Sequence, residues 1–142
     1  NSNRNLSKQL EIEQTPYVVL SNRIVFVKPE LEYKNIGRGM AKRITVALTM
    51  QEDKKDEATL LDGYQSHSID LGSNETSNPI KLWPPHLEQL GKPEYLTLYI
   101  FYFDQLDKSY TTQVKLKKED FGYKVMENSL LDKNSKATEE EL

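Results

Sequence analysis

Apolar and polar residues alternate in two stretches that flank a glycine-containing turn, within residues 31–50. In the first stretch, Leu31 and Tyr33 alternate with charged residues, and in the second, every other residue from Ile44 to Met50 is apolar. Such period-two alternation directs one set of side chains into a core and the other set into water. The segment therefore predicts antiparallel β-structure with one solvent-exposed face.

The turn between these stretches reads Asn35-Ile36-Gly37-Arg38-Gly39. A phosphate-binding loop would need a longer glycine pattern and a following helix, whereas a strand pattern follows here. We therefore interpret Asn35, Gly37 and Gly39 as a structural turn. The Asn35 side chain is expected to bond the loop backbone, and at least one of the two glycines is expected to adopt a positive φ.

Strand-like segments recur along the rest of the chain, and the strongest covers residues 94–103. There, Leu96, Leu98, Ile100 and Tyr102 share one face, and both faces are apolar enough for a central strand. Shorter strands are predicted at residues 17–20, 23–28, 64–71, 109–116 and 123–126, and Gly63 is expected to break the chain before residue 64. The residues expected to form the core are Val46, Leu48, Leu98, Ile100 and Val114.

Turn signals separate these segments at intervals of about ten residues, which is typical of all-β sandwiches. We therefore predict an antiparallel, immunoglobulin-like β-sandwich of about seven or eight strands. A juxtamembrane helix or linker is expected over residues 1–15, and Pro16 would end it. The sandwich domain is expected over residues 16–126. Residues 127–142 are expected to form a polar tail that is solvated or disordered.

The composition removes several classes of function. The chain has 142 residues, a net charge of −3 and no cysteine. It therefore has no disulfide, no thiol nucleophile and no cysteine-based metal site. Its charge does not indicate a nucleic-acid surface, so no nucleic-acid partner is expected. No apolar run reaches the roughly 18–20 residues that a membrane-spanning helix needs.

The residues that could carry chemistry do not converge. His67 and His86 are the only histidines, and a zinc site would need distant carboxylates to complete it. Residues 66–70 combine serine, histidine and aspartate, but neighbours in a strand point to opposite faces and no nucleophile elbow is present. Asp104 and Asp107 share a turn without the other ligands of a calcium loop, so they are expected to bond their own backbone. We expect a protein that is not an enzyme, with no cofactor or metal.

An aromatic face is the main candidate for interaction. Tyr95, Tyr99, Phe101 and Phe103 share the second face of residues 94–103. Three interpretations are open: cover by the protein's own chain, which we favour, a homodimer interface, or a ligand-binding patch. A mild basic cluster follows in the sequence and is interpreted as a solvated face, because acidic residues interrupt it. It consists of Lys115, Lys117, Lys118 and Lys124.

Three stretches together resemble a group of poorly characterised bacterial membrane-anchored proteins with a small immunoglobulin-like domain. They are Gln9-Leu10-Glu11 before Thr15-Pro16-Tyr17, the N-x-G-x-G-x-A motif from Asn35 to Ala41, and Leu98–Asp104 leading to Tyr110-Thr111-Thr112. The chain has Met40 where the group usually has proline, and Asp107-Lys108 where it usually has a glycine. The resemblance implies a β-sandwich and a membrane anchor upstream of residue 1, and it implies no catalytic residues.

The leading hypothesis is a non-catalytic, membrane-associated module that binds or positions an unknown protein partner. The alternative is a ligand-binding or adhesion domain outside the cytoplasm. Arg4 and Lys8 lie where an upstream membrane helix would leave the bilayer. Positive residues close to a membrane segment tend to stay on the cytoplasmic side, so that side is slightly preferred.

Overall fold

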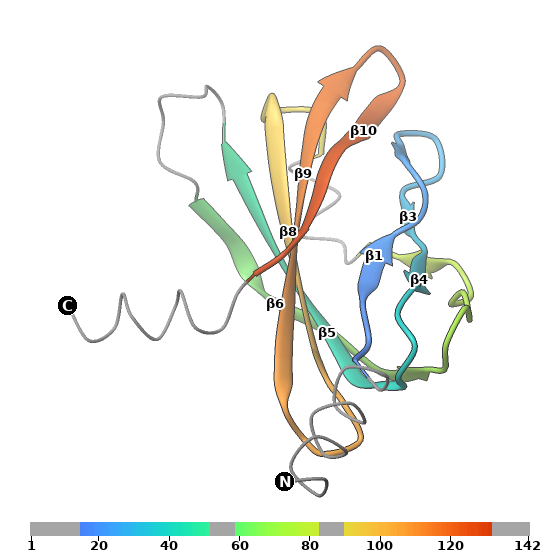
Figure 1. Cartoon of the computed structure of the whole chain (residues 1–142). Helices are drawn as coiled ribbons and strands as arrows, with labels where there is room; N and C mark the ends of the chain where they lie inside the picture. The colour runs from blue at the N-terminus through green and yellow to red at the C-terminus, as the bar shows by residue number, and fades with distance from the viewer. Residues whose placement is uncertain (1–14, 52–58, 83–89, 132–142) are drawn as a thin grey trace, which may run out of the picture.

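The structure is a computed structural model that describes the backbone of residues 15–51, 59–82 and 90–131, without the side chains of residues 59–68. The described residues form ten β-strands and no helix (Figure 1). All strand pairs are antiparallel, which confirms the predicted all-β class. The expected helix or linker over residues 1–15 lies almost wholly outside the described residues. The strands are β1 (Val18–Leu20), β2 (Ile24–Val25), β3 (Glu30–Leu31), β4 (Tyr33–Asn35), β5 (Ala41–Gln51), β6 (Thr59–Leu71), β7 (Ile80–Lys81), β8 (Tyr95–Phe103), β9 (Ser109–Glu119) and β10 (Gly122–Leu130).

The main layer is a six-stranded sheet in the order β2-β10-β9-β8-β5-β6, which curls strongly along its length (Figure 1). Strand β8 lies inside this sheet between β5 and β9, as its two apolar faces predict. Its residues alternate strictly between buried and half-exposed. The five residues predicted to form the core are all buried, at 0–2% exposure. This part of the sheet therefore follows directly from the period-two pattern.

The second layer consists of two small sheets, β1-β4 and β3-β7, that lie on one side of the large sheet (Figure 1). Strand β1 packs across β8, β9 and β10. The core between the layers contains the fully buried Tyr33 of β4, Tyr102 of β8 and Tyr123 of β10. The two small sheets cover the inner face of the large sheet, whereas the outward side chains of β8 stay half-exposed among the described residues.

Two irregularities shape the ends of the large sheet. The register between β5 and β8 shifts between Lys42 and Thr45, and Arg43 adopts a φ of 54° there. The register between β10 and β9 shifts between Val125 and Glu127, so that Met126 is the extra residue and is 55% exposed. Bulges of this kind redirect side chains locally and often lie near functional sites.

The strand predicted at residues 23–28 is shorter than expected. Pairing in β2 ends at Val25, and the chain then turns tightly, with the Lys28 N–H donating to the Val25 carbonyl at 3.2 Å. Val27 lies at the turn and is 93% exposed, although its residue type favours strands. The high β-propensity of this segment is therefore overridden by its tertiary position.

Strands β6 and β10 extend well beyond their predicted bounds. Strand β6 continues through Gly63, and its register with β5 shifts between Ala47 and Thr49, the place where a glycine can accommodate the irregularity. Strand β10 continues to Leu130, so residues 127–130 belong to the sheet and not to a polar tail. Pairing with β9 and two bonds to Asn128, from the Leu20 N–H and the Tyr17 hydroxyl, hold this polar segment in place. Residues 132–142 lie outside the described residues.

Candidate functional site

The turn after β4 is organised by the Asn35 side chain, which is completely buried. Its amide nitrogen donates to the Gly39 and Leu71 carbonyls at 2.7 and 3.0 Å. Its amide oxygen accepts from the Tyr17 and Gly37 N–H groups at 3.1 and 3.0 Å. The amide nitrogen thus donates two hydrogen bonds and the amide oxygen accepts two. The side chain therefore joins three segments of backbone, at Tyr17, at residues 37–39 and at Leu71.

The glycines of this turn do not have the positive φ that the sequence predicts. Within the described residues, Gly91 is the glycine with positive φ, at 92°. Gly37 is required for a different reason, because a Cβ there would lie 2.5 Å from the Thr15 carbonyl oxygen and 2.5 Å from the Tyr17 nitrogen. Close approach of two backbone segments, and not a left-handed conformation, therefore explains this glycine.

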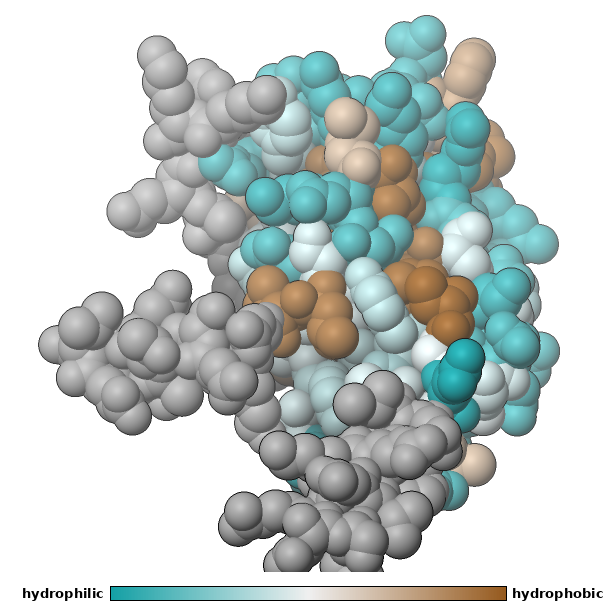
Figure 2. Space-filling view, in the orientation of Figure 1, coloured by the Kyte–Doolittle hydropathy of each residue, from teal (hydrophilic) through white to brown (hydrophobic). Residues whose placement is uncertain are grey.

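The outer face of β8 carries the predicted aromatic row. Tyr95, Tyr99, Phe101 and Phe103 all point to this face and are half-exposed. The Tyr99 and Phe101 rings stack, with centroids 6.5 Å apart and planes at 17°, and Gln113 donates to the Tyr99 hydroxyl at 3.2 Å. In the space-filling view, the apolar patches are separated by hydrophilic side chains on the face that is seen (Figure 2). Polar residues of β9 lie directly opposite the row, since Tyr99 pairs with Gln113 and Phe101 with Thr111, so the aromatic row belongs to a mixed surface.

The Phe103 end of this row is covered by charged side chains. The Arg43 guanidinium lies 4.3 Å from the Phe103 ring centroid, a cation–π distance. Arg43 and Lys42 also bind the Asp107 carboxylate, at 3.0 and 3.3 Å. Asp104 accepts from the N–H groups of residues 106 and 108 of the same turn, which confirms its expected bonds to the local backbone. These contacts close the hairpin between β8 and β9.

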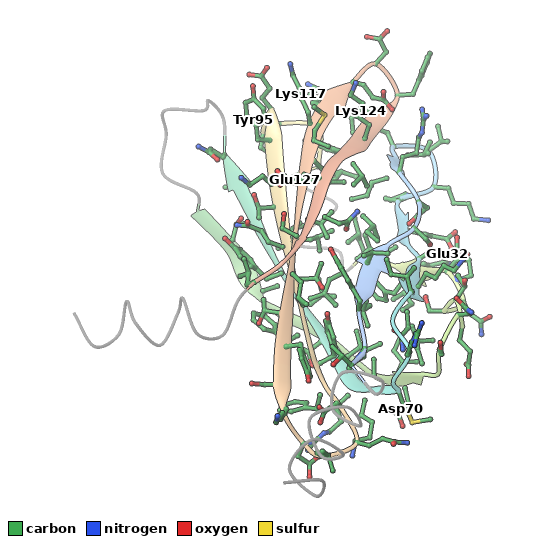
Figure 3. The ribbon with its side chains drawn as sticks, viewed as in Figure 1. Glu32, Asp70, Tyr95, Lys117, Lys124 and Glu127 are labelled. Carbon is green, nitrogen blue, oxygen red and sulfur yellow. The ribbon has the colours of Figure 1, made fainter. Side chains whose placement is uncertain are left out.

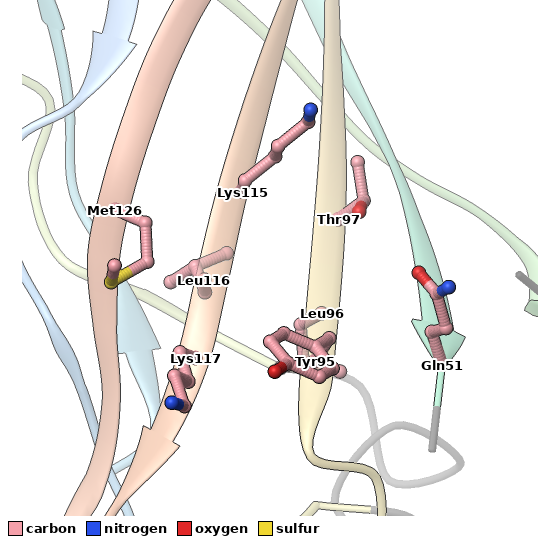
Figure 4. Close-up of a pocket in the computed structure, with 8 residues that line it drawn as sticks. All are labelled: Gln51, Tyr95, Leu96, Thr97, Lys115, Leu116, Lys117 and Met126. Carbon is pink, nitrogen blue, oxygen red and sulfur yellow. The ribbon is translucent and has the colours of Figure 1, made fainter. Parts of the chain in front are cut away.

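At the Tyr95 end of the row, the described residues leave a depression in the surface. This depression of about 470 Å³ lies on the outer face, over strands β5, β8, β9 and β10 (Figure 4). Tyr95, Lys117 and Lys124 lie near the same end of the sheet (Figure 3). The side chains that line the depression include Gln51, Tyr95, Thr97, Lys115, Lys117 and Met126.

The antiparallel register creates this cluster. Tyr95 pairs with Lys117, and Lys117 pairs in turn with Lys124. In the sequence, the aromatic row and the lysines are separate features about 20 residues apart, as Tyr95 and Lys117 show. If the two strands that flank the predicted turn at residues 104–108 are paired residue by residue outward from that turn, Tyr95 lies opposite Lys117. The sequence does not indicate that Met126 joins this cluster, because its position depends on the bulge in β10.

Among the described residues, three buried tyrosines have pKa values that the fold clearly shifts. Burial raises the pKa of Tyr33, Tyr102 and Tyr123 above the ordinary tyrosine value. For Tyr102 a hydroxyl–hydroxyl bond with Thr112 at 2.8 Å partly offsets the effect of burial on the pKa. The Tyr123 hydroxyl donates to the Pro93 carbonyl at 2.6 Å. These groups lie in the core, so they act on stability and not on a surface site.

The remaining candidates for chemistry are the two histidines and the serines beside His67. The side chains of His67, His86 and the serines beside His67 lie outside the described residues. Within the described residues, no group of three or more histidine or carboxylate side chains could hold a metal ion. The described residues also include no helix with the length and hydrophobicity needed to cross a membrane.

No protein-family model, no curated protein and no solved structure matches the chain.

Proposed function

We propose that this chain is a non-catalytic, immunoglobulin-like β-sandwich module that binds a protein partner through the outer face of its six-stranded sheet. The observation that carries the proposal is the row of half-exposed aromatic residues on the central strand β8. Aromatic side chains at a mixed surface supply large contact area at low entropic cost, which is why they are enriched in protein interfaces.

The layered arrangement supports the sandwich part of this proposal. The inner face of the large sheet carries the core, with the two small sheets packed against it. Successive side chains of each strand point alternately to the inner and the outer face, so substitutions on the outer face leave the core intact. A rigid sheet that presents a fixed pattern of side chains is a suitable platform for recognition.

Site-specific photo-crosslinking in cells that express the full-length protein tests the proposal. A crosslinking phenylalanine analogue is introduced in place of Phe101 on the outer face or, as a control, in place of Lys34 in the second layer. A defined adduct is expected from position 101 and not from position 34, and Tyr99→Ser should remove it. Equal adducts from both positions, or none from position 101, would contradict the proposal. An adduct of twice the chain's mass would identify a second copy as the partner.

The module is further proposed to work beside a membrane, preferably on the cytoplasmic side. This part rests on the resemblance described above and on Arg4 and Lys8, because cytoplasmic flanks of membrane segments are enriched in positive residues. Protease added to intact cells should leave the domain of the full-length protein uncut, whereas loss of the domain without lysis would indicate the opposite side.

A further inference from the structure

The Tyr95 end of the outer sheet face concentrates positive charge. Lys115 and Lys117 follow each other at alternate positions of β9, and Lys124 lies directly across from Lys117 on β10. Lys115 and Lys124 are exposed, and Lys117 is half-exposed beside Tyr95 (Figures 3 and 4). Like charges placed directly opposite each other destabilise a sheet, so the pair of Lys117 and Lys124 has a cost in the free protein.

These three ammonium groups have no ion-pair or hydrogen-bond partner among the described residues. Glu127 is the acidic residue opposite Lys115, but its carboxylate accepts instead from the Ser129 hydroxyl at 2.9 Å. A neighbouring depression at the end of the sheet has a different charge pattern, because acidic residues lie beside its lysines. It is lined by Lys92, Glu94, Lys118, Glu119 and Asp120.

We propose that the Tyr95 end of the outer face binds an extended acidic segment of the protein partner, an inference that rests on the proposed function. Charge complementarity selects the occupant, because carboxylates would neutralise three lysines that have no ion-pair partner among the described residues. They would also relieve the repulsion between Lys117 and Lys124. Tyr95 and Met126 supply apolar contact beside the lysines in the same depression. Regions of opposite potential of this kind contribute mainly to specificity and to the rate of association.

The spacing of the lysines specifies the segment further. Side chains on one face of an extended chain repeat every second residue, at about 6.5–7 Å. Lys115 and Lys117 have this same repeat on β9. A peptide with acidic residues at alternate positions can therefore place one carboxylate near each lysine, while a helical segment would present its acids three or four residues apart.

Fluorescence anisotropy with a labelled peptide of alternating glutamate and serine tests this inference. The peptide is expected to bind, and binding should weaken between about 0.1 M and about 1 M salt, where the screening length falls from about 10 Å to about 3 Å. The double variant Lys117→Glu/Lys124→Glu should weaken binding about tenfold or more, because it replaces attraction with repulsion. The matched control Lys28→Glu/Lys34→Glu makes the same change in net charge away from the outer face and should alter binding less than about twofold.

Equal binding of a peptide with glutamine in place of glutamate would overturn the inference, and so would an equal loss of binding in the control variant. Binding of vesicles of anionic lipid without binding of the peptide would also overturn it. Thermal melts of both double variants establish that they are folded. The crosslink at position 101 separates this inference from the proposed function. If the adduct persists in Lys117→Glu/Lys124→Glu and the peptide does not bind, the acidic specificity is wrong and the interaction face stands. If wild type gives no adduct, the proposed function itself fails.

Discussion

At the scale of single residues, the turn around Asn35 shows how a polar side chain can be essential inside a core. A buried amide that lacked partners would cost about 1–3 kcal/mol per unsatisfied group. Asn35 avoids this cost because four backbone groups, two donors and two acceptors, surround it. The same bonds bring the chain at Tyr17 close to Gly37, and this close approach leaves no room for a Cβ.

Replacing Gly37 with alanine should therefore lower the free energy of unfolding by about 1–3 kcal/mol, as other overpacked sites do. The added methyl group would meet the backbone of residues 15–17, which cannot move without breaking the bonds to Asn35. Urea denaturation measures the change. Gly72→Ala is the matched control, since its methyl group would meet only the end of the exposed Glu75 side chain and should cost less than about 1 kcal/mol. Equal losses in the two variants would contradict the close-approach explanation.

At the scale of elements, the sequence predicts best the strands that combine strict alternation with a clear turn. Strands β5, β8 and β9 fulfil both conditions, and their inward residues are buried as predicted. The ends of β2, β6 and β10 depend instead on partners distant in sequence. Asn128 lies in β10 because it pairs with Val114 and accepts from Leu20, and no local pattern in the polar segment after Met126 reveals these contacts.

The candidate site also combines features that the local sequence predicts with features that depend on residues distant in sequence. Its aromatic row on β8 can be predicted from alternation alone, because the four residues lie at alternate positions of the strand and therefore share one face. The association of Tyr95 with Lys117 and Lys124 requires the register of two hairpins. The depression additionally requires the bulge at Met126, and bulges have no reliable sequence signal of their own.

The two faces of β8 should respond differently to truncation. Leu98→Ala removes a completely buried side chain from the middle of the core and should lower the free energy of unfolding by about 2–5 kcal/mol. Thr97→Ala changes the neighbouring, half-exposed side chain on the outer face and should cost less than about 1 kcal/mol. Chemical denaturation of both variants measures the difference. A larger loss for Thr97→Ala than for Leu98→Ala would mean that the assignment of faces is reversed.

At the scale of the whole molecule, the two layers meet around tyrosines. Tyr33 enters the core from the second layer, and Tyr102 and Tyr123 enter it from the large sheet. Tyr123 also contacts Phe26 edge to face, at 5.7 Å between ring centroids, so it anchors the chain near β2. A core with several phenol groups remains neutral at physiological pH, but it links folding to protonation in alkaline solution.

The direction of this linkage follows from the raised pKa values. Burial disfavours the charged phenolate, so Tyr33, Tyr102 and Tyr123 stay protonated in the folded protein at a pH where the unfolded chain, with an ordinary pKa of about 10, already releases protons. The stability associated with these groups is therefore fully present below a pH of about 10 and decreases as the pH rises above it.

We expect the melting temperature of the wild-type protein to fall steeply above a pH of about 10, and to fall less steeply in Tyr33→Phe, because phenylalanine has no proton to lose. Thermal melts at a series of alkaline pH values, with tyrosinate absorbance recorded in parallel, measure both quantities. All the other side chains are common to both proteins, so the difference between the two slopes isolates Tyr33. The absorbance of its phenolate should develop together with unfolding. If wild type and Tyr33→Phe lose stability with the same slope, Tyr33 is not held neutral by the contact between the two layers, and the packing of β4 against the large sheet is looser than its burial indicates.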